Sequence, residues 1–442
     1  MKEINKIEKE FMKINNQYKY TWEKEGKKIL LDENKIKLTE KERKILEILL
    51  IQEVPNDLHR NLWLICSGAR LLQKENNGNY SKLLKFSEEL ENKNHYFYKY
   101  LTKKISHDLY RSDLKEEEIY KLKNILNAFN VRNLSINYCQ GLNIIVSYLL
   151  KMTNYNEEES YYLFIKLMED ILPFDFFFFA IGIETEINLI KKLIEIFDKE
   201  LYEHLNTLNS FCFLDSKISM WIISLMLFKT DIRISNFFFD CAFFFCVNND
   251  NFISVLYKMI FSILEILRNE LLECQQSSKI SEILDKFINN PISEENYKKL
   301  IYYNLIKKNK INFCDKKVFE VRKREIKKVM NQKKMDYKFE ENIEEVKCNK
   351  YFPLCIKEKE EKPVEDFVVY KSGNNQSLYI IDNYYKIENN ENNNKNEILV
   401  NNNNNDKNNI IYNNENQENI IEDNENDYMR NLIIERRKHF CE

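Results

Sequence analysis

The chain has few residues that break regular structure, with 6 glycines and 5 prolines among its 442 residues. This shortage disfavours a protein of many short strands and favours helices joined by short polar loops. Leu, Ile and Phe recur at three- and four-residue spacings, which is the period of an amphipathic helix. With 44% hydrophobic and 13% aromatic residues, the chain also has ample material for a large core. We therefore predict an all-α fold.

Several motifs that would supply chemistry directly are missing from the sequence. The glycines are too far apart for a G-x-G-x-x-G loop or a Walker-type phosphate loop, since they stand at Gly26, Gly68, Gly78, Gly141, Gly182 and Gly373. Neither a G-x-S-x-G elbow nor an H-E-x-x-H helix occurs. The ten cysteines form no C-x-x-C pair, and no histidines cluster near the tightest pairs, Cys241/Cys246 and Cys348/Cys355. We expect reduced thiols, no metal site and no nucleotide loop.

Charge and hydropathy exclude further classes of protein. The formal net charge is −3, which gives no global attraction to nucleic acid, and the basic stretch at 321–334 is best interpreted as a solvated helix face. The N-terminus lacks an apolar signal region, and Lys2 and Cys441 stand at the wrong positions for myristoylation and prenylation. The least charged stretches, 133–150 and 218–228, are too polar or too short to span a membrane. We predict a cytoplasmic protein with no transmembrane segment.

Composition changes along the chain divide it into four parts. Dense helical periodicity defines the central part, whereas Asn, Glu and Asp dominate the C-terminal tail, with five consecutive asparagines at 401–405. Such a tail cannot bury enough apolar surface to offset its ordering entropy. The four parts are a charged N-terminal extension (1–49), a helical domain (50–330), a linker with a small hairpin from 367–370 and 377–382 (331–387), and a low-complexity, largely disordered tail (388–442).

Helices can be placed within the central part. The clearest one follows "SDLKEEEIYKLKNILNAF", with Asp113 as the capping residue, Glu116 three positions later, and an apolar face at helical spacing that runs from Ile119 to Phe129. Further helices are predicted at 158–170, 184–200, 217–229, 234–247, 252–273, 279–289 and 294–307.

Two short segments stand out, "ISHDLYR" at 105–111 and "NYCQGLN" at 137–143. Asp108 and Arg111 are three residues apart and can touch on one helix face. On spacing alone, this pair is better explained as an ordinary surface ion pair. The amide cluster of the second segment, which precedes the apolar run "IIVSYLL", is by default a helix cap.

Taken together, the two segments resemble the paired fingerprint of TBC domains, the GTPase-activating proteins of Rab-family small GTPases. The fingerprint is I-x-x-D-x-x-R followed, here after 29 residues (140 − 111), by the Gln of Y-x-Q-G-[ML]-N. The resemblance extends from about 50 to 330, and it implies a curved all-α array of helices in two halves. It also includes "VPNDLHRNLWLICSGA" (54–69), "EEESYYLFIKLMEDILP" (157–173), and Trp221 with Asp240 in "MWIISLMLF…FFFDCAFF".

The resemblance implies a role for each matching residue. Arg111 matches the arginine finger and Gln140 the glutamine finger, which would act on GTP and Mg²⁺ bound by the partner GTPase, so that the chain needs no cofactor of its own. Asp108 would hold Arg111, and the remaining residues would shape the glutamine loop (Tyr138, Gly141 and Asn143) or support the core (Trp63, Trp221 and Asp240).

The sequence also departs from the family pattern. His59 stands where the family has Arg, with Arg60 next to it, and the other departures are Ser112, Asn137, Asp231 and Phe239. We predict a GTPase-activating protein that acts on a GTP-loaded Rab, regulates vesicle trafficking and meets membranes only through its partners. The alternative is a catalytically silent TBC-fold binding module or scaffold for a GTPase or tethering factor.

Overall fold

The structure is a computed structural model that describes residues 2–92, 96–110, 112, 114–133, 138–173, 176–177, 181–249, 252–307 and 316–332. All of them lie in one compact unit of the chain. Helices account for the regular structure of these residues, and no strand occurs within the described ranges, which confirms the all-α prediction. Arg111, Asp113, Asn137, the predicted hairpin and the predicted disordered tail lie outside the described residues.

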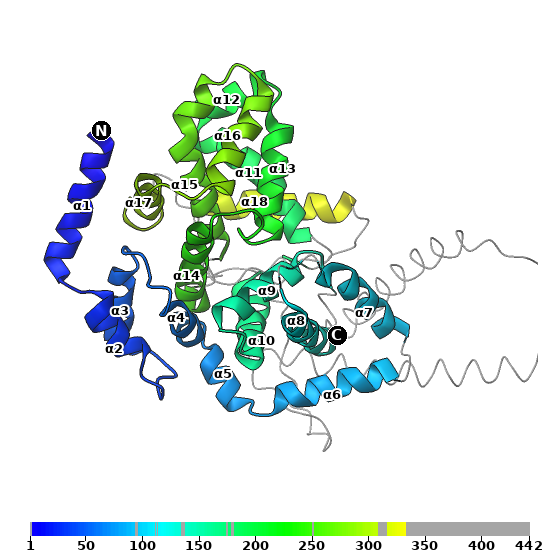
Figure 1. Cartoon of the computed structure of the whole chain (residues 1–442). Helices are drawn as coiled ribbons and strands as arrows, with labels where there is room; N and C mark the ends of the chain where they lie inside the picture. Colours follow the sequence, from blue (N-terminus) through cyan, green and yellow to red (C-terminus); the bar gives the residue numbers. More distant parts are fainter. Residues whose placement is uncertain are drawn as a thin grey trace, which may run out of the picture. The chain divides into compact units, whose positions relative to one another are not determined.

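The N-terminal and central helices follow one another with short connections (Figure 1). They are α1 (Lys2–Tyr18), the π-helical turn η1 (Trp22–Gly26), α2 (Lys27–Leu30), α3 (Glu40–Leu49), α4 (His59–Cys66), α5 (Ala69–Glu75), α6 (Asn79–Asn92), α7 (Tyr96–Leu109), α8 (Glu116–Arg132), α9 (Leu142–Met152), α10 (Glu157–Ile165) and η2 (Lys166–Ile171).

The remaining helices follow from residue 181 to residue 332. They are α11 (Ile181–Phe197), α12 (Lys199–Thr207), α13 (Phe211–Ile223), α14 (Ile232–Asn249), α15 (Phe252–Glu273), α16 (Ser277–Asn289), α17 (Glu294–Ile301), η4 (Tyr302–Ile306) and α18 (Lys316–Gln332).

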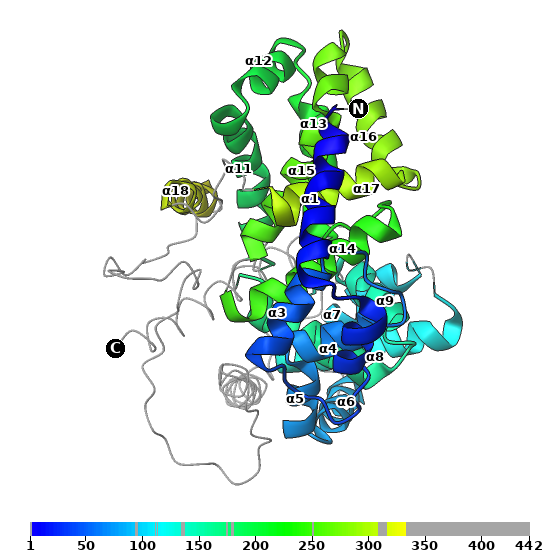
Figure 2. The ribbon, with the colours of Figure 1, turned by 90° about the vertical axis from the view of Figure 1, so that its left-hand side faces the viewer.

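The helices fall into two groups, one built around α8 and the other around α11 and α15 (Figures 1 and 2). In the first group α8 packs against α6, α7, α9 and α10. In the second group α11 packs against α12, α13 and α18, and α15 packs against α14, α16 and α17. Helix α14 also contacts α4 and η2, so it joins the second group to the first. Within the first group, α8 brings the end of α7 and the start of α9 to the same place.

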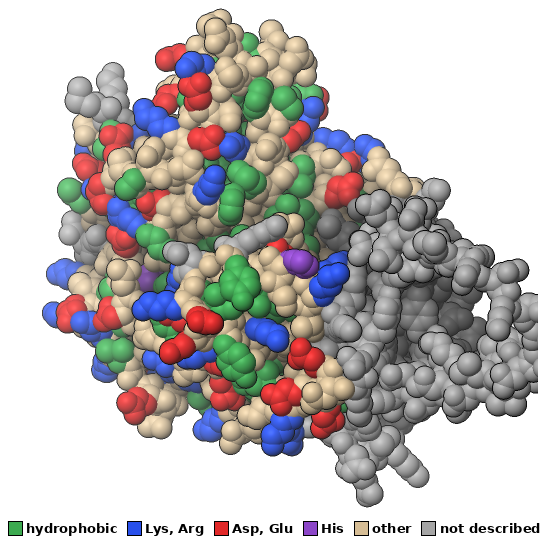
Figure 3. All heavy atoms as spheres, turned by 45° about the vertical axis from the view of Figure 1, so that its right-hand side comes forward, with side chains coloured by type: hydrophobic (Ala, Val, Ile, Leu, Met, Phe, Trp, Pro, Cys, Tyr) green, Lys and Arg blue, Asp and Glu red, His purple; other side chains and the backbone are tan. Residues whose placement is uncertain are grey.

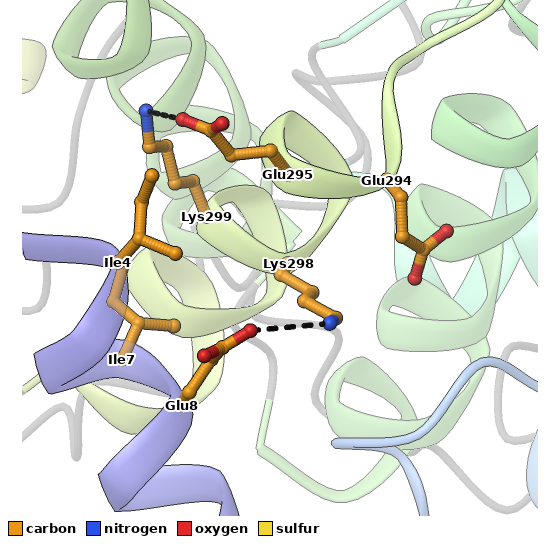
Figure 4. A pocket seen from close by; sticks show the side chains of 7 residues that line it. All are labelled: Ile4, Ile7, Glu8, Glu294, Glu295, Lys298 and Lys299. Atoms are coloured by element: carbon orange, nitrogen blue, oxygen red, sulfur yellow. Dashed lines mark ion pairs between the residues drawn. The ribbon is translucent and has the colours of Figure 1, made fainter. Parts of the chain in front are cut away.

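The N-terminal segment, predicted as an extension, contributes to the folded body. Trp22, Leu30, Leu46 and Leu49 are buried in the same hydrophobic core as the helices that follow. Helix α1 lies against α17, where Ile4, Ile7 and Glu8 face Lys298 and Lys299 across a pocket, and Lys298 Nζ lies 3.7 Å from Glu8 Oε1 (Figure 4). The domain boundary at residue 50 stays a prediction.

Two predicted helices, 217–229 and 184–200, differ clearly from those of the structure. The predicted helix at 217–229 is wrong at both ends, because α13 starts at Phe211 and ends at Ile223. It ends there because Leu225 and Met226 adopt positive φ angles of 50° and 63°, which no α-helix can continue. The predicted helix at 184–200 is two helices, α11 and α12, and Asp198 between them accepts a hydrogen bond from the backbone N–H of Leu201.

The start of α8 also differs from the predicted one. The helix begins at Glu116 with Lys115 at the capping position, where the Glu118 carboxylate accepts a hydrogen bond from the backbone N–H of Lys115 at 2.8 Å. A carboxylate in the first turn can reach back in this way regardless of which residue occupies the capping position. The predicted apolar face is present, since Leu122, Ile125 and the other predicted core positions up to Phe129 are buried.

Candidate functional site

Asp108 joins the end of α7 to the segment that leads into α9. Its carboxylate Oδ2 accepts a hydrogen bond from the Tyr138 hydroxyl at 3.0 Å, and its backbone carbonyl accepts one from the Asn143 amide at 2.9 Å. All three residues are buried. Two hydrogen bonds between segments 30 and 35 residues apart therefore fix the flanks of the predicted glutamine loop relative to α7.

Gly141 gives this loop a conformation that other residues rarely adopt. Its φ is 108° and its ψ is −24°, and it directly precedes the first residue of α9. A Cβ atom at Gly141 would lie 3.1 Å from both the carbonyl oxygen and Cγ2 of Ile223. Both the left-handed backbone and the close approach to α13 of the same chain favour glycine at this position.

Gln140 is exposed at the tip of this frame, with a half-buried Cys139 before it and a buried Gly141 after it. Burial raises the pKa of the Cys139 thiol, so that it stays protonated and unreactive near neutral pH. The Gln140 side chain can present both a carbonyl acceptor and an NH₂ donor to a bound molecule. The frame thus displays one neutral, bifunctional group to solvent.

Arg111 lies outside the described residues, so its predicted contact with Asp108 stays a prediction. Its neighbours in the sequence are described. Leu109, the last residue of α7, is buried, whereas Tyr110 has 80% of its surface exposed. The backbone N–H of Ser112 donates to the carbonyl of Leu109 at 3.1 Å.

A buried ion pair lies at the C-terminal end of α8, ahead of the segment that carries Gln140. Arg132, in the last turn of α8, and Glu169 of η2 form a two-pronged contact, with Nε to Oε1 at 3.0 Å and Nη2 to Oε2 at 2.8 Å. The two side chains are 3% and 8% exposed. Such a contact fixes direction as well as distance. No local pattern predicts this contact, because the partners are 37 residues apart in separate helices.

Asp240 forms the centre of a second polar cluster, in the core between α4 and α14. Its Oδ1 accepts a hydrogen bond from Trp63 Nε1 at 2.7 Å and lies 2.8 Å from His59 Nδ1. On the far side of His59, Nε2 lies 3.4 Å from the amide of Asn236, whose Oδ1 accepts a hydrogen bond from Tyr148 at 2.5 Å. All five side chains are buried. Trp221, which is also buried, belongs to α13.

Several departures from the family pattern find partners in this core. His59 stands beside Asp240, and burial alone would lower its pKa, but the charge and hydrogen bond of Asp240 outweigh burial and raise it. The neighbouring Arg60 binds Glu159 of α10 at 2.7 Å and 2.8 Å. Phe239 packs against Trp63, with 5.7 Å between the ring centroids.

Asp231, directly before α14, accepts hydrogen bonds from two backbone N–H groups. Its Oδ1 accepts a hydrogen bond from the backbone N–H of Arg233, and its Oδ2 accepts one from the backbone N–H of Ile292. It therefore connects α14 to the segment between α16 and α17.

The described residues contain neither a metal-binding cluster nor a membrane-spanning helix. Within the described ranges, no three His, Cys, Asp or Glu side chains converge closely enough to hold a metal ion. In the same part of the chain, none of the helices combines the length and the apolar character that crossing a membrane requires.

Comparisons with known proteins agree with this geometry. Residues 56–272 match the family described as RabGAP-TBC, the Rab-GTPase-TBC domain. A TBC domain-containing protein of Schizosaccharomyces pombe is 29% identical over 243 residues, which are 53% of this chain and 29% of that protein. Growth hormone-regulated TBC protein 1 of Homo sapiens is 26% identical over 246 residues, 53% of this chain and 66% of that protein. The matched part is thus less than two thirds of the length of either relative.

The fold has a counterpart among solved structures. The crystal structure of the Chlamydomonas flagellar RabGAP TBC domain is similar, with a TM-score of 0.51 and 19% sequence identity over 68% of this chain and 95% of that chain. This likeness concerns the fold alone. The two segments that carried the resemblance, 105–111 and 137–143, both lie within the residues that match the family. The chain belongs to the TBC-domain family, through a domain that includes residues 56–272.

Proposed function

We propose that this chain is a GTPase-activating protein for a Rab-family small GTPase, with Arg111 and Gln140 as its two catalytic residues. The observation that carries the proposal is the exposed Gln140, presented by a loop whose flanks are hydrogen-bonded to Asp108. Asp108 precedes Arg111 by three residues in the sequence, and the proposal gives it the further role of holding Arg111. A helix cap needs a side chain that is bonded to the helix, whereas Gln140 is exposed and its neighbours Tyr138 and Asn143 are bonded to Asp108. This arrangement favours a catalytic role for Gln140 over a capping role.

The chemistry follows from the charge that develops when water attacks the γ-phosphate of GTP. Negative charge spreads over the phosphoryl oxygens, and a guanidinium inserted from outside stabilises it by a factor of about 10³–10⁵ in rate. The amide of Gln140 can accept a hydrogen bond from the attacking water through its carbonyl and donate one to a phosphate through its NH₂ group. This arrangement needs no covalent intermediate, and the partner would supply GTP and Mg²⁺.

Family membership supports the class of partner proposed here. The described relatives are TBC proteins, and the similar solved domain is named a RabGAP. A role in vesicle trafficking belongs to the same proposal, as does recruitment to endomembranes through the partner. A binding module that docks a GTPase without accelerating hydrolysis is the competing function.

Single-turnover GTP hydrolysis across a panel of GTP-loaded Rab proteins tests the proposal. We expect the wild type to accelerate at least one Rab, and Arg111→Ala to lower that acceleration by about 10³ or more. Gln140→Ala should lower it by about 10²–10³, a typical loss for one positioned polar group. The exposed Arg324 and Gln275, changed to Ala, are the matched controls and should leave the rate unchanged. If the wild type binds GTP-loaded Rab proteins and accelerates none, the chain is the binding module instead.

A further inference from the structure

The exposed side chains in the last two turns of α7 form one continuous face. Ile105, Asp108 and Leu109 are buried, at the spacing of a helix face that packs on the core. The remaining residues of 103–110 are exposed, and the last of them, Tyr110, directly follows the helix. We call these residues the finger-side face of α7, and they are Lys103, Lys104, Ser106, His107 and Tyr110.

The finger-side face carries basic and aromatic groups and no carboxylate. Asp108, the one acid in these turns, is turned inward toward Tyr138. Tyr110 is 80% exposed, so most of its aromatic ring is open to a partner. Although the whole chain has a net charge of −3, this face is positive.

Lys104 stands four residues before Asp108, whose carboxylate and backbone carbonyl accept hydrogen bonds from Tyr138 and Asn143 on either side of Gln140. Burial raises the pKa of the Cys139 thiol, and the positive charge of Lys104 opposes that rise. On the face that Figure 3 shows, acidic, basic and hydrophobic side chains are mixed. A local positive face steers and orients a partner rather than attracting any anion from a distance.

We propose that the finger-side face of α7 is a docking surface for the GTPase, on which Tyr110 anchors the partner and Lys103 and Lys104 meet its acidic side chains. The proposal rests on the function proposed above and adds the residues that select the partner. Aromatic side chains at the centre of an interface often carry much of the binding energy. Charged residues around them set orientation and association rate.

The position of the lysines favours acidic side chains of a protein over the nucleotide phosphates. Lys104 precedes the last residue of α7 by five positions, which corresponds to about 7–8 Å along a helix axis. It is therefore set back from the point where Arg111 and Gln140 would reach the γ-phosphate. A group at that distance contacts the protein surface around the nucleotide, so its removal should change KM more than kcat.

Steady-state kinetics with the Rab that the wild type accelerates best tests this surface on the full chain. We expect Tyr110→Ala to raise KM about tenfold with kcat nearly unchanged. The double variant Lys103→Glu/Lys104→Glu should lower kcat/KM about tenfold at low salt, and less at high salt because ions screen exposed charges. Matched controls are Ile196→Ala, which removes another exposed apolar side chain, and Lys82→Glu/Lys85→Glu on the exposed surface of α6.

The outcomes separate this proposal from the proposed function. If the wild type accelerates a Rab and the α7 variants keep their KM while Gln140→Ala loses rate, the docking surface is wrong and the catalytic proposal stands. Loss of binding to phosphatidylserine vesicles in the lysine variants, with KM unchanged, would mark a membrane surface and would also overturn it. A panel in which no Rab is bound or accelerated overturns both proposals.

Discussion

Asp108 and Asp240 each lie in a buried polar cluster, and the two clusters differ in what they hold in place. Asp108 accepts hydrogen bonds from a tyrosine and an asparagine, whereas Asp240 accepts one from a tryptophan and lies beside a histidine. The Asp108 cluster includes Tyr138 and Asn143, and it ends at the exposed Gln140. The Asp240 cluster stays within the core, where each of its side chains is buried. A buried polar cluster can therefore hold an exposed group in place or hold two helices together, and its composition alone does not tell which.

The difference predicts two kinds of variant. Changes in the Asp240 cluster should lower the free energy of unfolding, since they leave buried polar groups without partners. Changes in the Asp108 cluster should lower GTP hydrolysis as well as stability, since they release the loop that carries Gln140. Four experiments follow from this contrast, in order of decreasing effect.

Asp240→Ala should have the largest effect on stability. It leaves His59 and the indole N–H of Trp63 without their acceptor in a site that is 2% exposed, so we expect a loss of about 3–5 kcal/mol in the free energy of unfolding. Denaturant unfolding followed by circular dichroism measures it. The control is Glu203→Ala, an ion-paired carboxylate with 64% of its side chain exposed, for which we expect less than about 1 kcal/mol. Equal losses in the two variants would contradict the role given to the Asp240 cluster.

Gly141→Ala should have the next largest effect, because it combines two costs. The backbone at φ 108° strains any L-residue, and the new Cβ would lie 3.1 Å from the carbonyl oxygen of Ile223. We expect a loss of about 3 kcal/mol in stability, with GTPase activation also reduced.

Gly78→Ala is a matched control for this variant. Gly78 also has a positive φ, 77°, but a Cβ there meets no atom within 4 Å. Backbone strain alone should cost about 1 kcal/mol at this position. The difference between the two variants therefore isolates the contact with α13. If both lose the same stability, that contact does not shape the loop.

Tyr138→Phe removes one hydrogen bond from the Asp108 cluster and keeps the ring. A hydrogen bond to a charged group is worth about 1.5–3 kcal/mol, and we expect a loss near the lower limit together with about a tenfold fall in Rab activation. Tyr120→Phe is the control, because Tyr120 is 62% exposed on α8. Unchanged hydrolysis in the Tyr138 variant would show that Gln140 does not depend on this frame.

The sequence could predict the Asp108 cluster in part. Local periodicity identified the helices. The resemblance to the TBC fingerprint gave Asp108 the role of holding Arg111, and it gave Tyr138 and Asn143 the role of shaping the glutamine loop. The exact partners could not be derived, since Asn143 binds the backbone carbonyl of Asp108 while Tyr138 binds its carboxylate. A backbone acceptor is available at every residue, so no side-chain pattern points to it.

The Asp240 cluster was less predictable, and the end of α13 was not predictable at all. Trp63 and Asp240 are 177 residues apart, and nothing local to either segment indicates that they meet. Leu225 and Met226 are apolar residues that normally continue a helix, yet both adopt positive φ angles. Tertiary packing decides such conformations, and residue preferences only weight them.

The smallest expected effect is the change of unfolding free energy with pH. Its measurement tests the Asp240 cluster without removing any side chain from the wild-type core. Because Asp240 raises the pKa of His59 in the folded chain, the protonated form stabilises the fold. That contribution is complete below the unfolded pKa of about 6.5 and is lost as the pH rises through the folded value. We expect the free energy of unfolding to fall across this window in the wild type and not in His59→Gln. His107→Gln, which changes an exposed histidine of α7, should keep the wild-type slope. If both histidine variants retain that slope, the proton that stabilises the fold does not reside on His59, and Asp240 stabilises the core through its bond to Trp63.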